Sequence, residues 1–175
     1  LVNRAFVSRQ IEKLRPRIEA LANQLIDRFP AAGPVDLIEA YCTPIPVTVI
    51  AELLGVPVEE GPRLVDWSHR MVAMYTPGRT RAVEDSAVAA THEFVGFLKE
   101  YVAVRRREPK DDLISHLIAA EAAGDRLSEG ELIAGCIQLL NAGHEATVHS
   151  IGNAVKAILE SGRDPAWLLQ SEKTV

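Results

Sequence analysis

The hydrophobic positions of this chain recur at helical spacing along almost its whole length. Apolar side chains return every three or four residues in five segments, residues 9–29, 35–54, 58–75, 80–107 and 111–123. This period places apolar residues on one face of an α-helix. No run of alternating β-branched residues is long enough to indicate a sheet. The pattern therefore predicts a mainly α-helical protein.

Proline and glycine residues separate the predicted helices, as is typical of helix ends. Pro44 and Pro46 fall inside the segment 35–54. A helix tolerates proline in its first turn, where the missing N–H has no intrahelical partner. We therefore expect one helix over 35–54, with both prolines near its start.

The last predicted helix, from residue 129 to about 160, is the longest. Ser128 and Glu131 have the spacing of a capping box, and Gly162 suits the position after the helix end. At 1.5 Å per residue this helix is about 45 Å long. Its apolar residues lie on more than one face, so we expect it to be central and buried on several sides.

The stretch LLNAGHEATVHS, residues 139–150, interrupts the apolar pattern of this helix. A glycine inside a helix costs about 1 kcal/mol relative to alanine, so Gly143 indicates a need for space. Ala142 and Ala146 extend this space into a shallow groove, with Glu145 and Thr147 beside it. The Thr147 hydroxyl can bond to the carbonyl one turn back. Two interpretations of the groove remain open here, a crossing point for another helix and a binding surface for a ligand.

Spacing argues against two other kinds of site in the same helix. His144-Glu145 followed by His149 resembles the HExxH zinc motif, but the histidines are five positions apart. They therefore point about 140° apart on a regular helix, and only a π-bulge would align them. Cys136 and His144 lie roughly 12 Å apart along the axis, too far for a nucleophile and its base. We predict no metal site.

Composition narrows the classes of function. The chain has 175 residues, 47% of them hydrophobic and 25% charged, with a net charge of −5. These values are typical of one soluble globular domain and give no electrostatic reason for nucleic-acid binding. No window approaches the roughly 20 apolar residues of a membrane-spanning helix. Cys42 and Cys136 are far apart and lack metal-ligand spacing, so we expect reduced thiols in a cytoplasmic protein.

Several segments of the sequence resemble a known protein family. The stretch LLNAGHEATVHSIGNAVKAIL closely resembles the central I helix of bacterial cytochrome P450 monooxygenases, whose motif is Ala/Gly-Gly-x-acid-Thr. Three flanking segments are similar to the family in the same order, LVNRAFVSRQIEKLRPRIEALANQLIDRF, PVDLIEAYCTPIPVTVIAELLGVP and KDDLISHLIAAEAAGDRLSEGELI. The resemblance covers essentially residues 1–175. It implies one partial P450 domain, from the end of the C helix through the long buried I helix.

The resemblance also implies a cofactor and a chemistry. In this family haem b lies against the I helix, which assigns Ala142, Gly143 and Ala146 to the cofactor-binding side, with room for dioxygen. It makes Glu145 and Thr147 the candidates for relaying protons to the oxygen in a dry pocket. The implied reaction inserts one oxygen atom from O2 into a small organic substrate. A ferredoxin or flavodoxin would donate the electrons.

Four residues are candidates for contact with that substrate. Gln138 and Asn141 lie about one turn before Gly143, and the Asn141 amide could orient a polar group of the substrate. Met74 and Tyr75 are candidates for a roof over it. For these two residues ordinary core packing is the alternative.

The sequence departs from the family pattern at two places. The position after the acid is Ala146, and the hydroxyl follows at Thr147, turned by about 100°. Some family members with alanine there, including macrolide hydroxylases, draw the hydroxyl from substrate or ordered water. Second, the family's Phe-x-x-Gly-x-x-x-Cys-x-Gly loop and Glu-x-x-Arg helix do not occur, and neither Cys42 nor Cys136 matches the ligand loop. We expect the haem thiolate to lie outside these residues, in a larger protein, and the chain alone to be inactive.

Two alternatives compete with a haem-thiolate monooxygenase. One is a non-catalytic, haem-less P450 remnant or helical interaction module, which the missing ligand loop favours. Gly143 and Glu145 argue against it, because a buried acid without a partner is costly. The other is an unrelated bundle of helices packed through small residues, which the flanking similarities disfavour.

Overall fold

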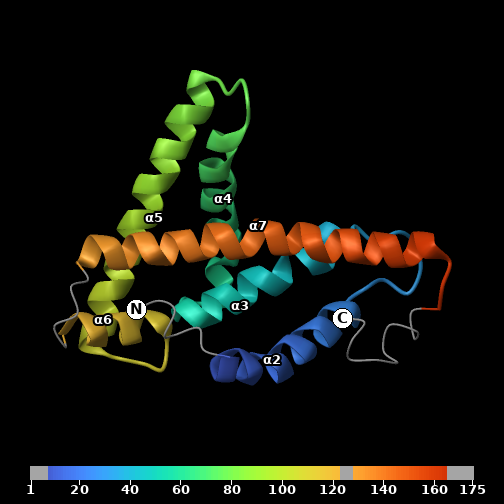
Figure 1. Ribbon diagram of the computed structural model, residues 1–175, viewed down its shortest axis with the longest axis horizontal. Coiled ribbons are helices and arrows are strands. Elements are labelled where there is room, and N and C mark those ends of the chain that lie inside the picture. Colours follow the sequence, from blue (N-terminus) through green and yellow to red (C-terminus); the bar gives the residue numbers. More distant parts are fainter. Residues whose placement is uncertain (1–7, 123–127, 165–175) are drawn as a thin grey trace.

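The computed structural model describes residues 8–122 and 128–164, and it is mainly α-helical (Figure 1). The part of the chain that it describes contains no β-strand, as the apolar spacing predicts. None of the helices in that part is both long and apolar enough to cross a bilayer. The elements are α2 (Ser8–Ile26), η1 (Ile38–Cys42), α3 (Pro44–Leu54), η2 (Val58–Glu60), α4 (Gly61–Val72), η3 (Ala73–Tyr75), α5 (Arg81–Arg107), α6 (Leu113–Ala122) and α7 (Glu129–Ser161).

Helix α7 crosses the whole molecule (Figure 1). Its 33 residues begin at the expected capping box, where the Glu131 N–H donates to Ser128 Oγ at 3.3 Å and the Ser128 N–H donates to Glu131 Oε2 at 2.8 Å. It ends at Gly162, which adopts the left-handed conformation with φ 63°. In the view of Figure 1, the hairpin of α4 and α5 extends above α7, and α2, α3 and α6 are seen below it. The expected long helix is confirmed.

The prediction of a single helix over residues 35–54 is wrong, because the structure has two elements there. A π-helical turn, η1, ends at Cys42, and α3 begins at Pro44. The prolines give the physical reason, because Pro44 and Pro46 have no N–H and a continuous helix would lose two of its hydrogen bonds there. With Pro44 as the first helical residue, both prolines lie in the first turn of α3, where no intrahelical donor is needed.

The helices share one main hydrophobic core. Trp67 of α4 stacks on Phe94 of α5 with ring centroids 5.0 Å apart. Leu132 and Leu140 of α7 are buried in the same cluster, and Leu54 of α3 joins them. This core buries one side of α7 and leaves another side for a different role.

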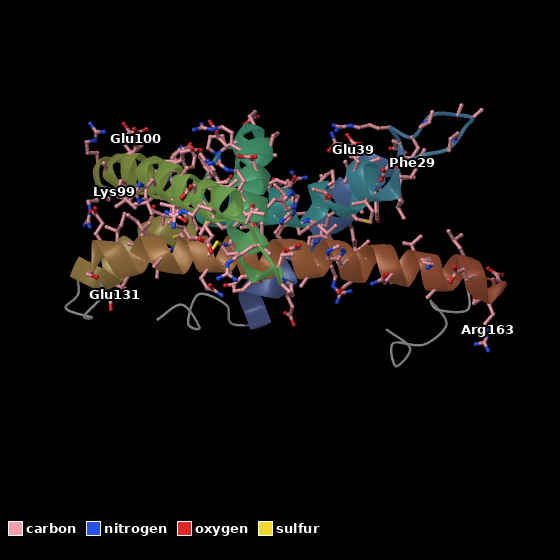
Figure 2. All side chains as sticks on the ribbon, turned by 90° about the horizontal axis from the view of Figure 1, so that it is seen from above. Phe29, Glu39, Lys99, Glu100, Glu131 and Arg163 are labelled. Carbon is pink, nitrogen blue, oxygen red and sulfur yellow. The ribbon has the colours of Figure 1, made fainter. Side chains whose placement is uncertain are left out.

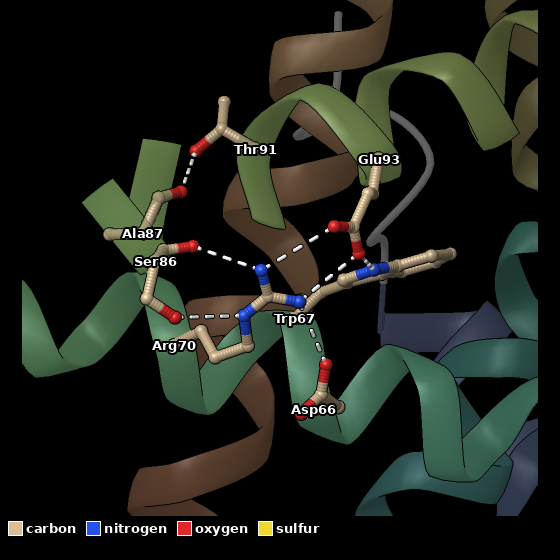
Figure 3. Close-up of polar contacts among 7 residues, drawn as sticks. All are labelled: Asp66, Trp67, Arg70, Ser86, Ala87, Thr91 and Glu93. Atoms are coloured by element: carbon tan, nitrogen blue, oxygen red, sulfur yellow. Dashed lines mark hydrogen bonds and ion pairs between the residues drawn. The ribbon is translucent and has the colours of Figure 1, made fainter. Parts of the chain in front are cut away.

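A network of polar contacts also holds α4 against α5 (Figure 3). The Arg70 guanidinium donates to Asp66 on its own helix, to both Ser86 oxygens and to the Glu93 carboxylate. The Trp67 indole N–H donates to Glu93 Oε2 at 2.9 Å. The hydrogen bonds from Arg70 and, to a smaller extent, from Trp67 lower the pKa of Glu93. The hairpin is therefore fixed by polar pairing as well as by packing.

A buried ion pair connects α5 to α6 and to the end of α3. Arg105 Nε donates to Asp112 Oδ2 at 2.5 Å, and Arg105 Nη2 donates to the Gly55 carbonyl. Burial alone raises the pKa of Asp112, but hydrogen bonds from Ser115 and Arg105 hold it below its usual value. Gly55 is left-handed, with φ 84°, and a Cβ there would collide with Asp112. The last turn of α3 is thus held in place beneath α7.

Candidate functional site on the long helix

Several residues of α7 are exposed in the described part of the chain, and three of them form a line near the middle of the helix. Gln138, Ala142 and Ala146 are all exposed, and four-residue spacing places them in a row along the helix. Figure 2 shows most of the other helices on one side of α7. We call these three residues the open row. Two of them carry no atom beyond Cβ, so this surface is flat and lacks charge.

Gly143 does not belong to the open row. A Cβ at this position would lie 2.9 Å from Ile50 Cδ1 of α3. A Cβ at Gly152, farther along α7, would lie 2.8 Å from Ile38 Cδ1. Both glycines therefore let neighbouring elements approach α7 closely. For Gly143 the structure favours the helix-crossing interpretation over the ligand interpretation.

The two candidate proton-relay residues lie on nearly opposite sides of α7. Thr147 Oγ1 donates to the Gly143 carbonyl at 2.7 Å, the contact one turn back that the sequence predicts. Thr147 is exposed, and it lies two residues, or about 200°, farther around the helix than Glu145. The Glu145 side chain is 37% exposed, and its Oε1 lies 4.0 Å from His149 Nε2. The structure therefore does not bring Glu145 and Thr147 together.

Asn141 lies between the open row and the face of α7 that α4 covers. It is half-buried, and its Nδ2 is 3.9 Å from the Met71 sulfur of α4. Met74 and Tyr75 follow in η3, where Met74 is half-buried and Tyr75 is 85% exposed. Core packing thus does not account for Tyr75. The α4 side chain beside Asn141 is Met71, about one turn before Met74.

The burial of His144 against α4 was not predicted from the sequence. Its side chain is only 1% exposed, and its ring lies 5.5 Å from that of His69 on α4. Burial and the proximity of His69 lower the pKa of His144, so the ring is neutral. The sequence does indicate this burial, because His144 lies four residues after Leu140 and four before Val148. These two apolar residues are buried on the same face of the helix.

The open row fits a flat apolar group better than it fits a metal ion. Ala142 and Ala146 offer a surface without projecting side chains, which suits the plane of a haem. Within the described ranges, no group of three or more His, Cys, Asp or Glu side chains could hold a metal ion. Cys42 and Cys136 are fully buried and free, and burial raises the pKa of Cys136 to about 12. Neither thiol lies on the open row, so a thiolate facing that row would have to come from other residues.

No family model matches the sequence. Among curated proteins, the chain is 43% identical over 159 residues to cytochrome P450 107B1 of Saccharopolyspora erythraea, and 42% identical over 160 residues to vitamin D(3) 25-hydroxylase of Pseudonocardia autotrophica. Each match covers 91% of this chain and 38% of the relative. Among solved structures, CYP164A2 of Mycobacterium smegmatis with econazole bound is 41% identical with a TM-score of 0.83, over 91% of this chain and 41% of that one. The chain spans about two fifths of the length of these relatives.

Proposed function

Because this chain is a homologue of bacterial cytochrome P450s over most of its own length, we propose that the protein carrying it is a haem-thiolate monooxygenase. It would insert one oxygen atom from O2 into a small organic substrate, with electrons from a ferredoxin or flavodoxin, in the cytoplasm. Residues 1–175 would form the central part of its single P450 domain. The observation that carries this proposal is the exposed open row of Gln138, Ala142 and Ala146 near the middle of α7.

In this proposal the open row faces haem b. Bound there, the haem supplies the activation of O2 that no amino-acid side chain can supply. Ala142 and Ala146 leave space for the oxygen molecule because they project no further than Cβ. Gly143 acts differently, since its lack of a side chain holds α7 close to Ile50 of α3 and so fixes the height of the row. The thiolate ligand comes from residues outside this chain.

Glu145 is the proposed carrier of protons to the site. Its carboxylate is half-exposed beside His149, so it can exchange protons with solvent, and it lies next to the open row on the helix. Thr147 already donates its hydroxyl hydrogen to the Gly143 carbonyl one turn back. We therefore assign Thr147 to shaping α7, and a substrate hydroxyl or an ordered water to the position beside Ala146.

The substrate would lie along the row and its edge. Gln138 and Asn141 reach it from α7, while Met74 and Tyr75 are the candidates from η3. The relative named for hydroxylating vitamin D(3) supports a largely apolar molecule as the class of substrate. The amides of Gln138 and Asn141 would then bind the few polar groups of such a molecule.

The first test is spectroscopic. The protein that carries this chain is purified, reduced under carbon monoxide and examined for the red-shifted Soret band of a thiolate-bound haem. We expect the band in the unaltered protein, a weakened band in Ala142→Leu, and an unchanged band in Ala134→Leu, which is also exposed on α7 two turns earlier. A protein without the band would be the haem-less helical remnant instead, and the proposal would be wrong.

A second test addresses proton delivery. Glu145→Gln removes the carboxyl proton carrier and is expected to lower the turnover rate roughly a hundredfold. Ala146→Thr adds the hydroxyl that most of the family carries and is expected to raise the fraction of electrons that reach product. Unchanged coupling of electrons to product in Ala146→Thr would contradict substrate-assisted proton delivery.

A further inference from the structure

A histidine lies beside the proposed proton carrier. His149 Nε2 is 4.0 Å from Glu145 Oε1, one helical turn farther along α7. The imidazole side chain is 68% exposed and the carboxylate side chain is 37% exposed, so water reaches both. Among the described residues, neither side chain makes a hydrogen bond that would hold it in another direction. A small side-chain movement is therefore enough to join them by a hydrogen bond.

His149 also continues the line of the open row. It lies seven residues after Ala142, which at 100° per residue places it within about 20° of Ala142 around the helix and roughly 10 Å farther along it. Glu145 is next to Ala146 in the chain and one turn before His149. Glu145 is thus the residue that connects the exposed imidazole to the open row.

The other titratable groups near this pair are His144 on the same helix and His69 on α4. His149 lowers the pKa of His144 and Glu145 raises it, so the pair lies close enough to act on that ring. Burial lowers the pKa of His144 further, and the neutral ring adds no charge. The elements α3 and η1 contact this part of α7 through isoleucines, which are also uncharged. The carboxylate of Glu145 is therefore the charge that a proton on His149 meets.

Carboxylates and imidazoles hold a proton over different ranges of pH. An ordinary carboxylic acid is almost fully ionised at pH 7, so a carboxylate that delivers protons near neutrality needs a proton donor beside it. An imidazole takes up and releases protons between about pH 5 and pH 8. On a helix, an acid four residues before a cation is also the favourable order for attraction. The sequence and the geometry of the pair both suit transfer from the imidazole to the carboxylate.

We propose that His149 supplies the protons that Glu145 carries to the open row. The imidazolium Nε2–H donates its proton to Glu145 Oε1, which leaves a neutral imidazole and a carboxylic acid. The imidazole then takes a proton from solvent, and the acid gives its own to the water or substrate hydroxyl beside Ala146. This step rests on the proposed function, in which O2, two electrons and two protons give one inserted oxygen atom and one water molecule. His149 acts through Glu145, so it is a positioning residue.

The pairing is tested by crystal structures of the protein that carries this chain, at pH 5.5 and at pH 8.5. At the lower pH, where an imidazole is protonated, we expect His149 Nε2 within about 3.2 Å of Glu145 Oε1. A separation above about 3.5 Å at both pH values overturns the proposal. This distance does not depend on haem, so it is read separately from the Soret band, whose absence would overturn the proposed function.

The delivery of protons is tested by comparing two oxidants in the holoenzyme, with vitamin D(3) as the probe substrate. Oxidation by O2 with a ferredoxin donor consumes two protons, whereas hydrogen peroxide already carries the protons and electrons for the same product and water. We expect His149→Gln to lower O2-driven turnover about tenfold at pH 6, less than the loss expected from Glu145→Gln, because His149 acts at one remove. Peroxide-driven turnover should stay within about twofold. Exposed pairs add little to stability, so the variant should fold.

The matched control is His116→Gln, which removes another exposed histidine beside a carboxylate, with Nε2 3.2 Å from Asp111 Oδ1. It should leave both rates unchanged. In the unaltered protein, O2-driven turnover should fall between pH 6 and pH 8 as imidazoles lose their proton, and this dependence should disappear in His149→Gln. Equal losses with both oxidants, or an unchanged O2-driven rate in His149→Gln, would overturn the proposal.

Discussion

Successive residues of α7 face two different surroundings. Ala142 and Ala146 lie on the open row, whereas Leu140 and Val148 are enclosed by the other helices, and Gly143 contacts α3. A step of about 100° along the helix is enough to pass from one surrounding to the other. The residues on the covered side are apolar because they pack against the other helices. The small residues of the open side are exposed among the described residues, and the proposed haem site would account for their size.

This contrast predicts that stability depends on the covered side. Leu140 is fully buried in the main core, so Leu140→Ala should lower the free energy of unfolding by about 2–5 kcal/mol. Urea denaturation of the protein that carries this chain measures the change. Gln138→Ala, on the open row, should change it by no more than about 0.5 kcal/mol. Equal losses in the two variants would abolish the distinction between the two sides.

The next largest effect is expected at the crossing of α3 and α7. Gly143→Val should lower the free energy of unfolding by about 1–3 kcal/mol, because the new side chain collides with Ile50 Cδ1. Ile50→Val removes that Cδ1 atom, so the double variant should recover part of the loss. Ala142→Val places the same side chain on the open row and should have little effect on stability. A double variant with fully additive losses would show that Ile50 is not what requires the glycine.

The buried imidazole makes the covered side sensitive to pH. The pKa of His144 is held below its ordinary value of 6.5, first by burial and then by His69, with His149 acting in the same direction and Glu145 against it. Below pH 6.5 the unfolded chain binds a proton that the folded chain excludes. Stability is therefore full above pH 6.5 and falls by up to about 1.4 kcal/mol per pH unit down to the lowered pKa. His144→Phe should flatten this part of the stability profile, and an unchanged slope would assign it to other groups.

Most of the covered side could be predicted from the sequence, because local patterns determine it. The capping box at Ser128, the stop at Gly162 and the length of α7 follow from residues close together in the chain. The division of the 35–54 segment was missed, although Pro44 and Pro46 carry the signal, because apolar spacing alone cannot separate one helix from two aligned ones. Pro44 and Pro46 lack the N–H groups that a continuous helix needs, so the segment divides although its apolar spacing is continuous.

The candidate site depended on information that periodicity does not contain. The sequence identified Ala142, Gly143 and Ala146 as a group of small residues, but only the structure places Gly143 beside Ile50 of α3 and leaves the two alanines exposed. Likewise a single histidine in an apolar row reads as core. Its burial against the His69 ring of α4 becomes visible only in the structure.

The smallest effect is expected at Thr147, an exposed residue outside the open row. Thr147→Val keeps the shape and removes the hydroxyl that donates to the Gly143 carbonyl. Valine and threonine have similar helix propensities, and such back-bonds contribute little to helices, so the free energy of unfolding should change by no more than about 0.5 kcal/mol. Turnover and coupling should also stay within about twofold, since the hydroxyl hydrogen is already donated to the Gly143 carbonyl. The measurement is a parallel assay with Glu145→Gln, and an equally large loss of turnover in both variants would return the proton relay to Thr147.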